Sequence, residues 1–101
     1  MLEADVFRTL ADPTRRAVFE RLYHREMSVS ELKAGFAISQ PAISQHLAAL
    51  RAAGLVCERR EGRFVYYRAQ PQGLASLIEW VDGYRPERGE KLKGVLKDRE
   101  P

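Results

Sequence analysis

Residues 38–56 contain both the start and the end of a helix and therefore limit what the chain can fold into. Ser39 is a good N-cap, because its hydroxyl can accept a hydrogen bond from an unpaired amide of the first turn. Pro41 falls in that turn, where a missing N–H costs little. Gly54 suits the left-handed position after a helix, and Leu55 can supply the hydrophobic contact of a Schellman ending. The pattern predicts a helix of about four turns.

The predicted helix has two different faces. At about 100° per residue its apolar residues share one side, which we expect to be buried. They are Ile43, Leu47 and Leu50. The opposite face is small and hydrogen-bonding, without an acidic residue: Pro41, Ser44, Gln45, Ala48 and Ala52. Because Gln and Ser can read base edges in the DNA major groove, we interpret this helix as a DNA-reading helix. The alternative is an ordinary amphipathic surface helix, whose exposed face would usually carry more Lys and Glu.

The residues before the reading helix predict two longer helices. The first has apolar residues at helical spacing and should end near Leu10 or Ala11. Asp12 and Pro13 then form an N-cap and first-position pair that begins the second helix. The first helix has its apolar residues on one side: Leu2, Val6, Phe7 and Leu10. The second should turn Val18, Phe19 and Leu22 inward.

A short third helix is predicted between Ser28 and Gly35. Ser28 and Glu31 have the spacing of a capping box, in which hydroxyl and carboxylate satisfy each other's backbone amides. Leu32 should be buried, and the link from Gly35 to Ser39 is tight. The third helix and the reading helix therefore form a helix-turn-helix.

After Gly54 the spacing of apolar residues becomes that of strands. Residues 55–60 and 63–68 are rich in β-branched and aromatic residues, and Glu61-Gly62 between them is typical of a turn. This segment is predicted to be a β-hairpin. Arginines crowd its tip: Arg59, Arg60 and Arg63. Such a hairpin is a wing able to contact phosphates or a narrow minor groove.

Pro71 opens a last clear helix. Its apolar residues, with Trp80 beside them, are Leu74, Leu77, Ile78, Val81 and Tyr84. One side of this helix can cover the core, and the other needs a partner, because exposed apolar surface of this extent usually marks an interface. We expect residues 1–85 to form one winged helix-turn-helix domain, mainly α with a small β-hairpin, in the order α-α-α-α-β-β-α. Residues 86–101 should form a charged tail or a weak final helix.

Composition restricts the class of protein. The 101 residues are 45% hydrophobic and 31% charged, which indicates one globular domain. No apolar run approaches the ~18 residues of a membrane span, and no signal peptide opens the chain, so we expect no membrane association. A single cysteine excludes an internal disulfide framework and favours the cytoplasm. Residues 15–68 hold ten Lys/Arg but five Asp/Glu, a basic excess that suits double-stranded DNA as partner.

Four stretches of the sequence resemble the ArsR/SmtB family of bacterial transcriptional repressors. They are Leu10–Arg16, Ser39–Leu47, Ala53–Val56 and Glu61–Arg63. The similarity runs from about Val6 to Tyr84 in one register. It implies a homodimer that binds a palindromic operator in its own promoter region and blocks transcription. It also implies a dimer interface on the first and last helices, which we expect at Leu2, Val6, Leu77, Trp80, Val81 and Tyr84.

The same resemblance places the DNA contacts on the reading helix and the wing. The expected contact residues are Ser39, Gln40, Pro41, Ser44, Gln45, His46, Arg60 and Arg63. Pro41 departs from the commoner small polar residue, and its ring can contact a thymine methyl. We expect His46 to cap the helix or contact a phosphate. Arg15 and Arg16 resemble the family's second-helix arginines, for which packing, backbone contact and an ordinary solvated charge pair stay open.

The ligands of the family's metal sensors are absent from this sequence. One group carries two cysteines in the third helix, where this chain has Lys33 and Gly35. Another group uses Asp and His along the last helix, whereas the two histidines here, His24 and His46, lie upstream. A zinc site needs three or four converging ligands, and no such set is evident. We therefore expect no metal, no other cofactor, and DNA release that does not depend on a metal.

Without a metal, the protein would be a constitutive repressor governed by its own concentration. Two further interpretations stay open. Cys57 is either a small buried apolar residue or a thiol switch whose thiolate Arg59 and Arg60 could favour; whether any effector exists is unknown. A winged helix can also bind protein, but that would require large apolar anchors on the outer face of the reading helix. No catalytic combination of residues and no Gly-rich phosphate loop is present, so we expect no enzyme.

Overall fold

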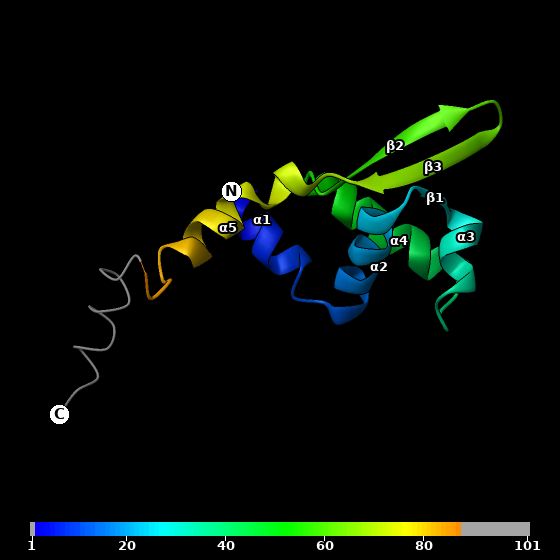
Figure 1. Ribbon diagram of the computed structural model, residues 1–101. Helices are drawn as coiled ribbons and strands as arrows, with labels where there is room; N and C mark the ends of the chain where they lie inside the picture. Colours follow the sequence, from blue (N-terminus) through cyan, green and yellow to red (C-terminus); the bar gives the residue numbers. More distant parts are fainter. Residues whose placement is uncertain (1, 88–101) are drawn as a thin grey trace.

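The computed structural model describes the backbone of residues 2–87 and the side chains of residues 6–87. The elements run in the order α1 (Leu2–Thr9), α2 (Pro13–His24), β1 (Met27–Ser28), α3 (Val29–Ala34), α4 (Gln40–Ala52), β2 (Val56–Glu61), β3 (Phe64–Ala69), the 3₁₀ helix η1 (Pro71–Leu74) and α5 (Ala75–Asp82) (Figure 1). The predicted winged helix-turn-helix is confirmed. The expected tail lies outside the described residues from position 88 onward. Within the described part of the chain, no helix combines the length and apolar character needed to cross a bilayer.

Both helices of the helix-turn-helix begin at the predicted capping residues. At α3, the Glu31 N–H donates to Ser28 Oγ at 3.2 Å, and the Ser28 N–H donates to Glu31 Oε1 at 2.9 Å. At α4, the Ser39 hydroxyl accepts the Ala42 N–H at 3.3 Å. Caps of this kind each stabilise a helix by about 1 kcal/mol. They fix the residues at which α3 and α4 start.

Helix α4 ends in the predicted Schellman motif. Gly54 has a φ of +76°, in the left-handed region that favours glycine. The Leu55 N–H donates to the Leu50 carbonyl at 2.9 Å, and the Gly54 N–H donates to the Arg51 carbonyl at 3.0 Å. These two bonds satisfy carbonyls that would otherwise lack partners at the helix end. The chain turns directly from α4 into the wing.

The core lies between α2, α3, α4 and the inner side of the sheet. Its buried residues are Val18, Phe19, Leu22, Met27, Leu32, Ile43, Leu47, Leu50, Ala53, Leu55 and Val56. The three inward residues predicted for α4 are at most 2% exposed. Since burying each such side chain contributes roughly 1.5–3 kcal/mol, their packing sets the rotation of α4. That rotation decides which residues α4 presents to solvent.

The hairpin is present, but its turn lies one residue later than predicted. Glu61 belongs to β2 and pairs with Phe64 of β3. The two-residue loop is therefore Gly62-Arg63, and Gly62 has a φ of +61°. A left-handed glycine at the first loop position followed by an ordinary residue is the pattern of a type II′ turn, which matches the twist of the strands.

A third strand, β1, joins the hairpin and was not predicted. Met27 pairs with Tyr67 and Ser28 with Tyr66, so that the antiparallel sheet has the order β1-β3-β2. Two residues are too few to show the alternation by which a strand is recognised in a sequence. The strand ties the start of α3 to the wing.

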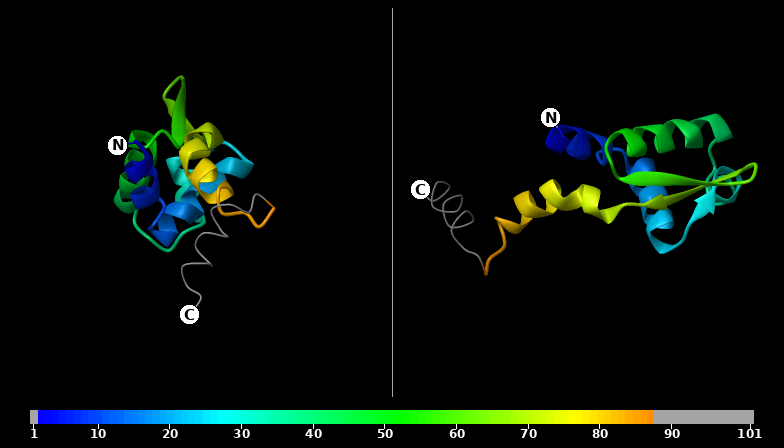
Figure 2. Two further views of the ribbon diagram at one scale, coloured as in Figure 1. Left: turned by 90° about the vertical axis from the view of Figure 1, so that its left-hand side faces the viewer. Right: turned by 90° about the horizontal axis from the view of Figure 1, so that it is seen from above.

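The last helix differs from the expectation in position and packing. Pro71 opens η1, and α5 follows only at Ala75. Of the residues predicted for this helix, Leu74 in η1 packs against the core, whereas no residue of α5 is buried. Instead α5 lies against α1 (Figure 2). The rings of Phe7 and Trp80 meet there edge to face, with 5.5 Å between their centroids. Phe7 remains 38% exposed beside this contact.

Gly73 lies where η1 meets the end of α4, and its lack of a side chain allows this close approach. A Cβ at position 73 would lie 2.3 Å from the carbonyl oxygen of Gly54. Because that atom is backbone, it cannot rotate away. We expect Gly73→Ala to lower the free energy of unfolding by about 1–3 kcal/mol, measured by urea denaturation.

Gly35→Ala is the matched control for this prediction. A Cβ at position 35 would meet only the guanidinium end of Arg21, a flexible side chain that can move. We expect its unfolding midpoint to stay near that of the wild type. A Gly73→Ala midpoint as high as that of Gly35→Ala would contradict the steric argument.

Asp12 caps α2 through a carboxylate that titrates. Its Oδ1 accepts the N–H of Thr14 at 2.8 Å and that of Arg15 at 3.1 Å. These bonds, the one from Arg15 above all, hold the pKa of Asp12 below its usual value. The Asp12 carboxylate therefore stabilises the folded protein fully at pH values above its unfolded-state pKa of about 3.9. This stabilisation is lost as the pH falls through the lower pKa that Asp12 has in the folded protein.

Asp12→Asn should remove this pH dependence, because an amide caps a helix without titrating in this range. We expect the thermal midpoint of the wild type to fall more steeply below about pH 4 than that of Asp12→Asn. Scanning calorimetry from neutral to acidic pH measures both slopes. Parallel curves for the two proteins would show that the Asp12 carboxylate contributes nothing to acid sensitivity.

Candidate nucleic-acid interface

Most of the residues predicted to read DNA lie together on the exposed side of the N-terminal half of α4. Gln40, Pro41, Ser44 and Gln45 are all exposed. Within the described part of the chain, the side chains of Gln40, Ser44 and Gln45 have no hydrogen-bond partner. Their donors and acceptors are free to bind a ligand. Ser39 is also exposed, but its hydroxyl already serves as the N-cap of α4.

His46 of α4 lies beside this surface, and through Arg15 of α2 it is connected to the end of α1. Its Nδ1 accepts a hydrogen bond from Arg15 Nε at 3.3 Å, and Arg15 Nη1 donates to the Thr9 carbonyl at 3.3 Å. His46 is half-buried and is not a capping residue, so that part of the expectation is wrong; its phosphate contact stays a prediction. The bond to Arg15 holds α4 against α2 and the end of α1.

Arg15 and Arg16 both bind backbone carbonyls at the end of α1. Arg16 Nη1 donates to the Leu10 carbonyl at 2.6 Å, in the same way that Arg15 binds Thr9. The last carbonyls of a helix lack partners within it, and cations are favoured there. A packing role within the protein is therefore the interpretation that the structure favours, since these arginines cap α1 from outside.

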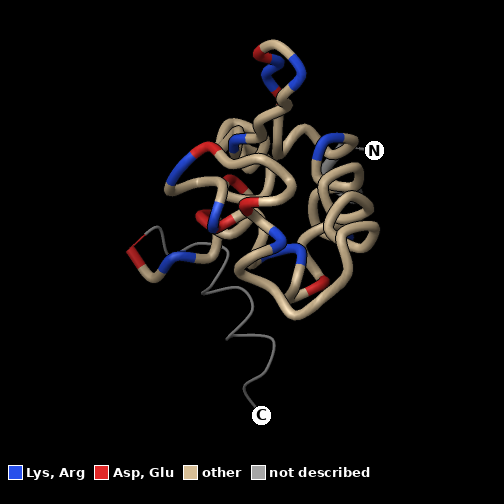
Figure 3. The backbone as a smooth tube through the Cα atoms, turned by 90° about the vertical axis from the view of Figure 1, so that its right-hand side faces the viewer, with Lys and Arg blue, Asp and Glu red and all other residues tan. Residues whose placement is uncertain are grey.

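Figure 3 shows basic positions gathered at the tip of the wing. The arginines predicted there are Arg60, near the end of β2, and Arg63, in the loop. Arg63 lies in the two-residue loop, exposed and without a partner among the described residues. Arg60 is 74% exposed, and Glu58 Oε2 lies 3.5 Å from its Nη2. Exposed pairs of this kind contribute little to stability, so both guanidinium groups are available to another anion.

Arg59 is not part of the tip, although the sequence groups it there. Its Nε and Nη2 donate to the two carboxylate oxygens of Glu26 at 3.0 and 2.7 Å, and its guanidinium lies 5.0 Å from the ring centroid of Tyr66. The hydrogen bonds from Arg59 hold the pKa of Glu26 below its usual value. Arg59 fastens the wing to the segment before β1.

Cys57 contacts a different arginine from those expected. Arg68 Nε donates to Cys57 Sγ at 3.2 Å across the β2–β3 pair. The expectation that Arg59 and Arg60 act on the thiol is wrong, because Arg59 is bound to Glu26 and Arg60 pairs with Glu58. Arg68 was missed because only the strand register brings it opposite Cys57.

The described residues contain no group of three His, Cys, Asp or Glu side chains close enough to hold a metal ion. His24 packs against the ring of Tyr23, with 5.5 Å between ring centroids. His46 is bound to Arg15. Neither histidine therefore has a neighbouring ligand set.

The residues predicted for a dimer interface differ in how much surface they expose. Trp80 and Val81 are about half exposed, whereas Val6 is 3% exposed and has little surface left for a partner. Leu77 and Tyr84 are half-buried. Leu2 lies in α1, but its side chain is outside the described residues. Phe7 and Ile78 are also exposed and apolar, although they were not predicted as interface residues. Together with Trp80 and Val81 they form what we call the α1/α5 surface.

Comparison with known proteins agrees with this geometry. Residues 10–59 match the family model described as a helix-turn-helix domain. The HTH-type transcriptional regulator Rv2034 of Mycobacterium tuberculosis is 48% identical over 78 residues, which are 77% of this chain and 73% of that protein. The arsenical resistance operon repressor of Escherichia coli is 35% identical over 100 residues, covering 97% of this chain and 85% of that protein.

A solved structure has the same fold. An ArsR-like transcriptional regulator from Rhodococcus sp. RHA1 superposes with a TM-score of 0.77 at 31% sequence identity, covering 98% of this chain and 93% of that one. The sequence motifs, the fold and these relatives agree with one another. The chain belongs to the ArsR/SmtB family of winged helix-turn-helix transcriptional regulators.

Proposed function

We propose that the protein is a homodimeric repressor that binds an inverted-repeat operator in its own promoter region. The single observation that carries this proposal is the free polar face of α4, whose rotation the core fixes. Glutamine can bind adenine through two hydrogen bonds, and the ring of Pro41 can contact a thymine methyl in the major groove. With DNA as its partner, we propose that the protein acts in the cytoplasm of a bacterial cell.

The wing supports the same arrangement. Arg60 and Arg63 project at the hairpin tip with exposed guanidinium groups. Phosphate contacts fix the register of a protein on the duplex, whereas base contacts supply its specificity. We propose that α4 reads bases in the major groove while the two arginines bind the neighbouring backbone.

The α1/α5 surface supports dimerisation. Ile78, Trp80 and Val81 expose about half of their side-chain surface next to Phe7. A twofold axis is the simplest way to cover such a surface. Two reading helices should then meet successive major grooves about 34 Å apart, which requires an inverted repeat.

Operator binding is proposed to need no metal ion and no other cofactor. Lys33 and Gly35 stand where one group of metal-sensing relatives carries cysteines. Repression then depends on the concentration of the protein itself, or on an effector that is not a metal ion. A module that binds protein is the other candidate class, but the outer face of α4 offers no large apolar anchor.

Fluorescence anisotropy with DNA from upstream of the protein's own gene tests the proposal. We expect tighter binding to this DNA than to random DNA of equal length, and a linear fall of log affinity with log salt. Footprinting should then show two protected half-sites. Equal affinity for upstream and random DNA would contradict autorepression, and no affinity for DNA at low salt would favour the protein-binding alternative.

Arg63→Ala should weaken binding to all DNA sequences alike. The arginine has no partner within the described residues, so its loss should leave folding unchanged. Each phosphate contact contributes about 0.9 to the slope of log affinity against log salt, and a dimer has two wings. We expect the slope to fall by about 1.8, as measured by anisotropy over a salt series.

Arg25→Ala is the charge-matched control, since Arg25 lies at the end of α2 and only approaches Glu31 at 3.8 Å. Its salt slope should equal that of the wild type. If Arg63→Ala weakened binding only to the operator, Arg63 would read a base and not a phosphate.

A further inference from the structure

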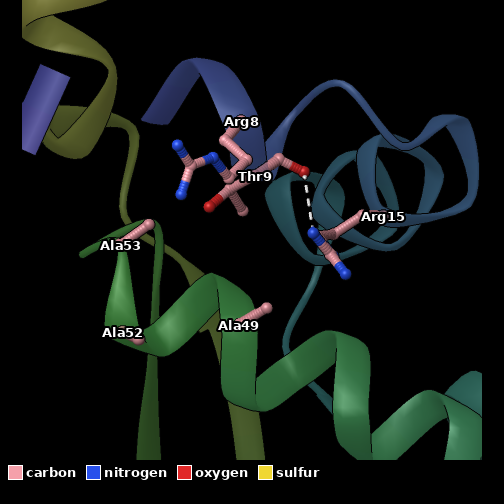
Figure 4. Close-up of a pocket in the computed structure, with 6 residues that line it drawn as sticks. All are labelled: Arg8, Thr9, Arg15, Ala49, Ala52 and Ala53. Carbon is pink, nitrogen blue, oxygen red and sulfur yellow. Dashed lines mark hydrogen bonds between the residues drawn. The ribbon is translucent and has the colours of Figure 1, made fainter. Parts of the chain in front are cut away.

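A cavity of about 310 Å³ lies between the C-terminal half of α4 and the end of α1. It is lined by Arg8, Thr9, Arg15, Ala49, Ala52 and Ala53. Figure 4 shows Arg8 and Thr9 on the α1 side, with the three alanines along the C-terminal end of α4 and its C-cap across from them. The volume is at the lower end of the range of about 300–1,000 Å³ typical of small-molecule sites.

The polar lining of this cavity is cationic. Arg8 has no hydrogen bond or ion pair within the described part of the chain. Arg15 uses Nε for His46 and Nη1 for the Thr9 carbonyl, which leaves its Nη2. Among the residues whose side chains are described, no carboxylate lines the cavity. Because the planar guanidinium donors match a carboxylate in geometry as well as in charge, the site favours an organic anion.

The opposite wall of the cavity is apolar and consists of small residues. Ala49, Ala52 and Ala53 present methyl groups and no aromatic ring. A ligand that fits both walls has a carboxylate at one end and a compact aliphatic body at the other. We propose that this cavity binds a small aliphatic carboxylate, with the carboxylate on the cationic wall that Arg8 and Arg15 supply and the body on the alanines.

A ligand bound in this cavity can change the affinity for the operator because of where the cavity lies. This step rests on the proposed function. Arg15 holds the Thr9 carbonyl and His46, the residue beside the reading face. A carboxylate bound to the remaining Nη2 would shift the guanidinium whose Nε and Nη1 hold His46 and the Thr9 carbonyl, and would thereby change how α4 is held. A ligand that binds two states with different affinity shifts the equilibrium between them, and operator and ligand must change each other's affinity by the same factor.

A DNA phosphate is the other anion that Arg8 and Arg15 could bind. The two arginines line a hollow at the C-terminal half of α4, whereas the reading residues 40–45 lie at its other end. A phosphate would leave the alanine methyl groups without an apolar partner. The geometry therefore favours the aliphatic carboxylate, and phosphate contact becomes one outcome of the test.

The binding step is tested without DNA, using cyclohexanecarboxylate as the probe and NMR of ¹³C-methyl alanine as the readout. We expect saturable shifts of the Ala49, Ala52 and Ala53 methyl signals. Cyclohexanecarboxamide, which has the same body without the charge, should shift them at least tenfold more weakly. Absence of saturable shifts, or equal affinity for the amide, would overturn the proposal.

Arg8→Gln should lower the affinity for cyclohexanecarboxylate at least tenfold. Lys33→Gln removes the same charge from α3, outside the cavity, and should leave the affinity unchanged. Ala49→Leu should fill the cavity and abolish binding, with the remaining alanine methyl signals showing that the variant is folded. Full affinity in Arg8→Gln would overturn recognition by this arginine.

The regulatory step is tested by measuring operator affinity with and without saturating cyclohexanecarboxylate. We expect at least a threefold change, absent in Arg8→Gln. If operator affinity were unchanged with the probe bound, the regulatory step would be wrong but the carboxylate site would stand. If the protein did not bind an operator at all, the proposed function would be wrong, and the NMR result would still test the site. If the probe did not bind and Arg8→Gln weakened all DNA equally, Arg8 would contact phosphate and the proposal would be wrong.

Discussion

Val81→Lys should convert the protein into a monomer and lower its affinity for the full operator by at least about a hundredfold. Val81 is 50% exposed on the α1/α5 surface, so the substitution removes no core contact. In a dimer the new ammonium group would be buried without a partner, which is strongly unfavourable. A monomer has a single reading helix and loses the high effective concentration that a second, linked helix provides.

Sedimentation velocity and anisotropy on the same samples check this prediction. Tyr23→Lys is the matched control, because Tyr23 is a 61% exposed apolar residue on α2 whose ring contacts only His24 among the described aromatic rings. It should remain a dimer with wild-type operator affinity. A Val81→Lys protein that sediments as a dimer, or a monomer that binds the full operator as tightly as the wild type, would contradict the proposed assembly.

The parts of the fold that the sequence predicts are those determined by neighbouring residues. The Ser39 cap, the Ser28–Glu31 capping box and the left-handed Gly54 each act within a few residues of their own position. Helical spacing likewise identified the inward side of α4, because burial along one helix repeats with its turn. These local signals were sufficient to place the reading face.

The parts that could not be predicted depend on residues far apart in the chain. Arg15 and His46 are 31 positions apart, and Cys57 and Arg68 are eleven apart; only the tertiary fold and the strand register bring them together. The packing of α5 on α1 is of the same kind. Apolar spacing showed that α5 needs a partner surface, but spacing does not say which element provides it.

The site was predicted more completely on the reading helix than on the wing. On α4 each exposed side chain follows from a regular rotation per residue. On the hairpin, three arginines close in sequence divide between two roles, since Arg59 binds Glu26 from the segment before β1 while Arg60 and Arg63 stay at the tip. Whether an arginine is free depends on the acid that the fold places next to it, and the sequence does not state that pairing.

Gln45→Ala should produce the largest loss of sequence-specific binding. A bidentate contact between glutamine and a base contributes about 1–3 kcal/mol of discrimination. Because a dimer presents Gln45 twice, we expect a loss of about 2–6 kcal/mol on the full operator. The side chain is exposed and without a hydrogen-bond partner within the described residues, so the variant should fold as the wild type does.

Anisotropy on operator and random DNA, followed by selection of bound sequences from a randomised half-site, measures the effect. Base preference should relax at one position in each half-site, and affinity for random DNA should not change. The control is Gln72→Ala, which removes an exposed glutamine side chain from η1. It should change neither the base preference nor the affinity for the operator. An equal loss on operator and random DNA would show that Gln45 binds backbone. In the Val81→Lys protein the cost of Gln45→Ala should be halved, because a monomer presents one reading helix, and this double variant separates base reading from assembly.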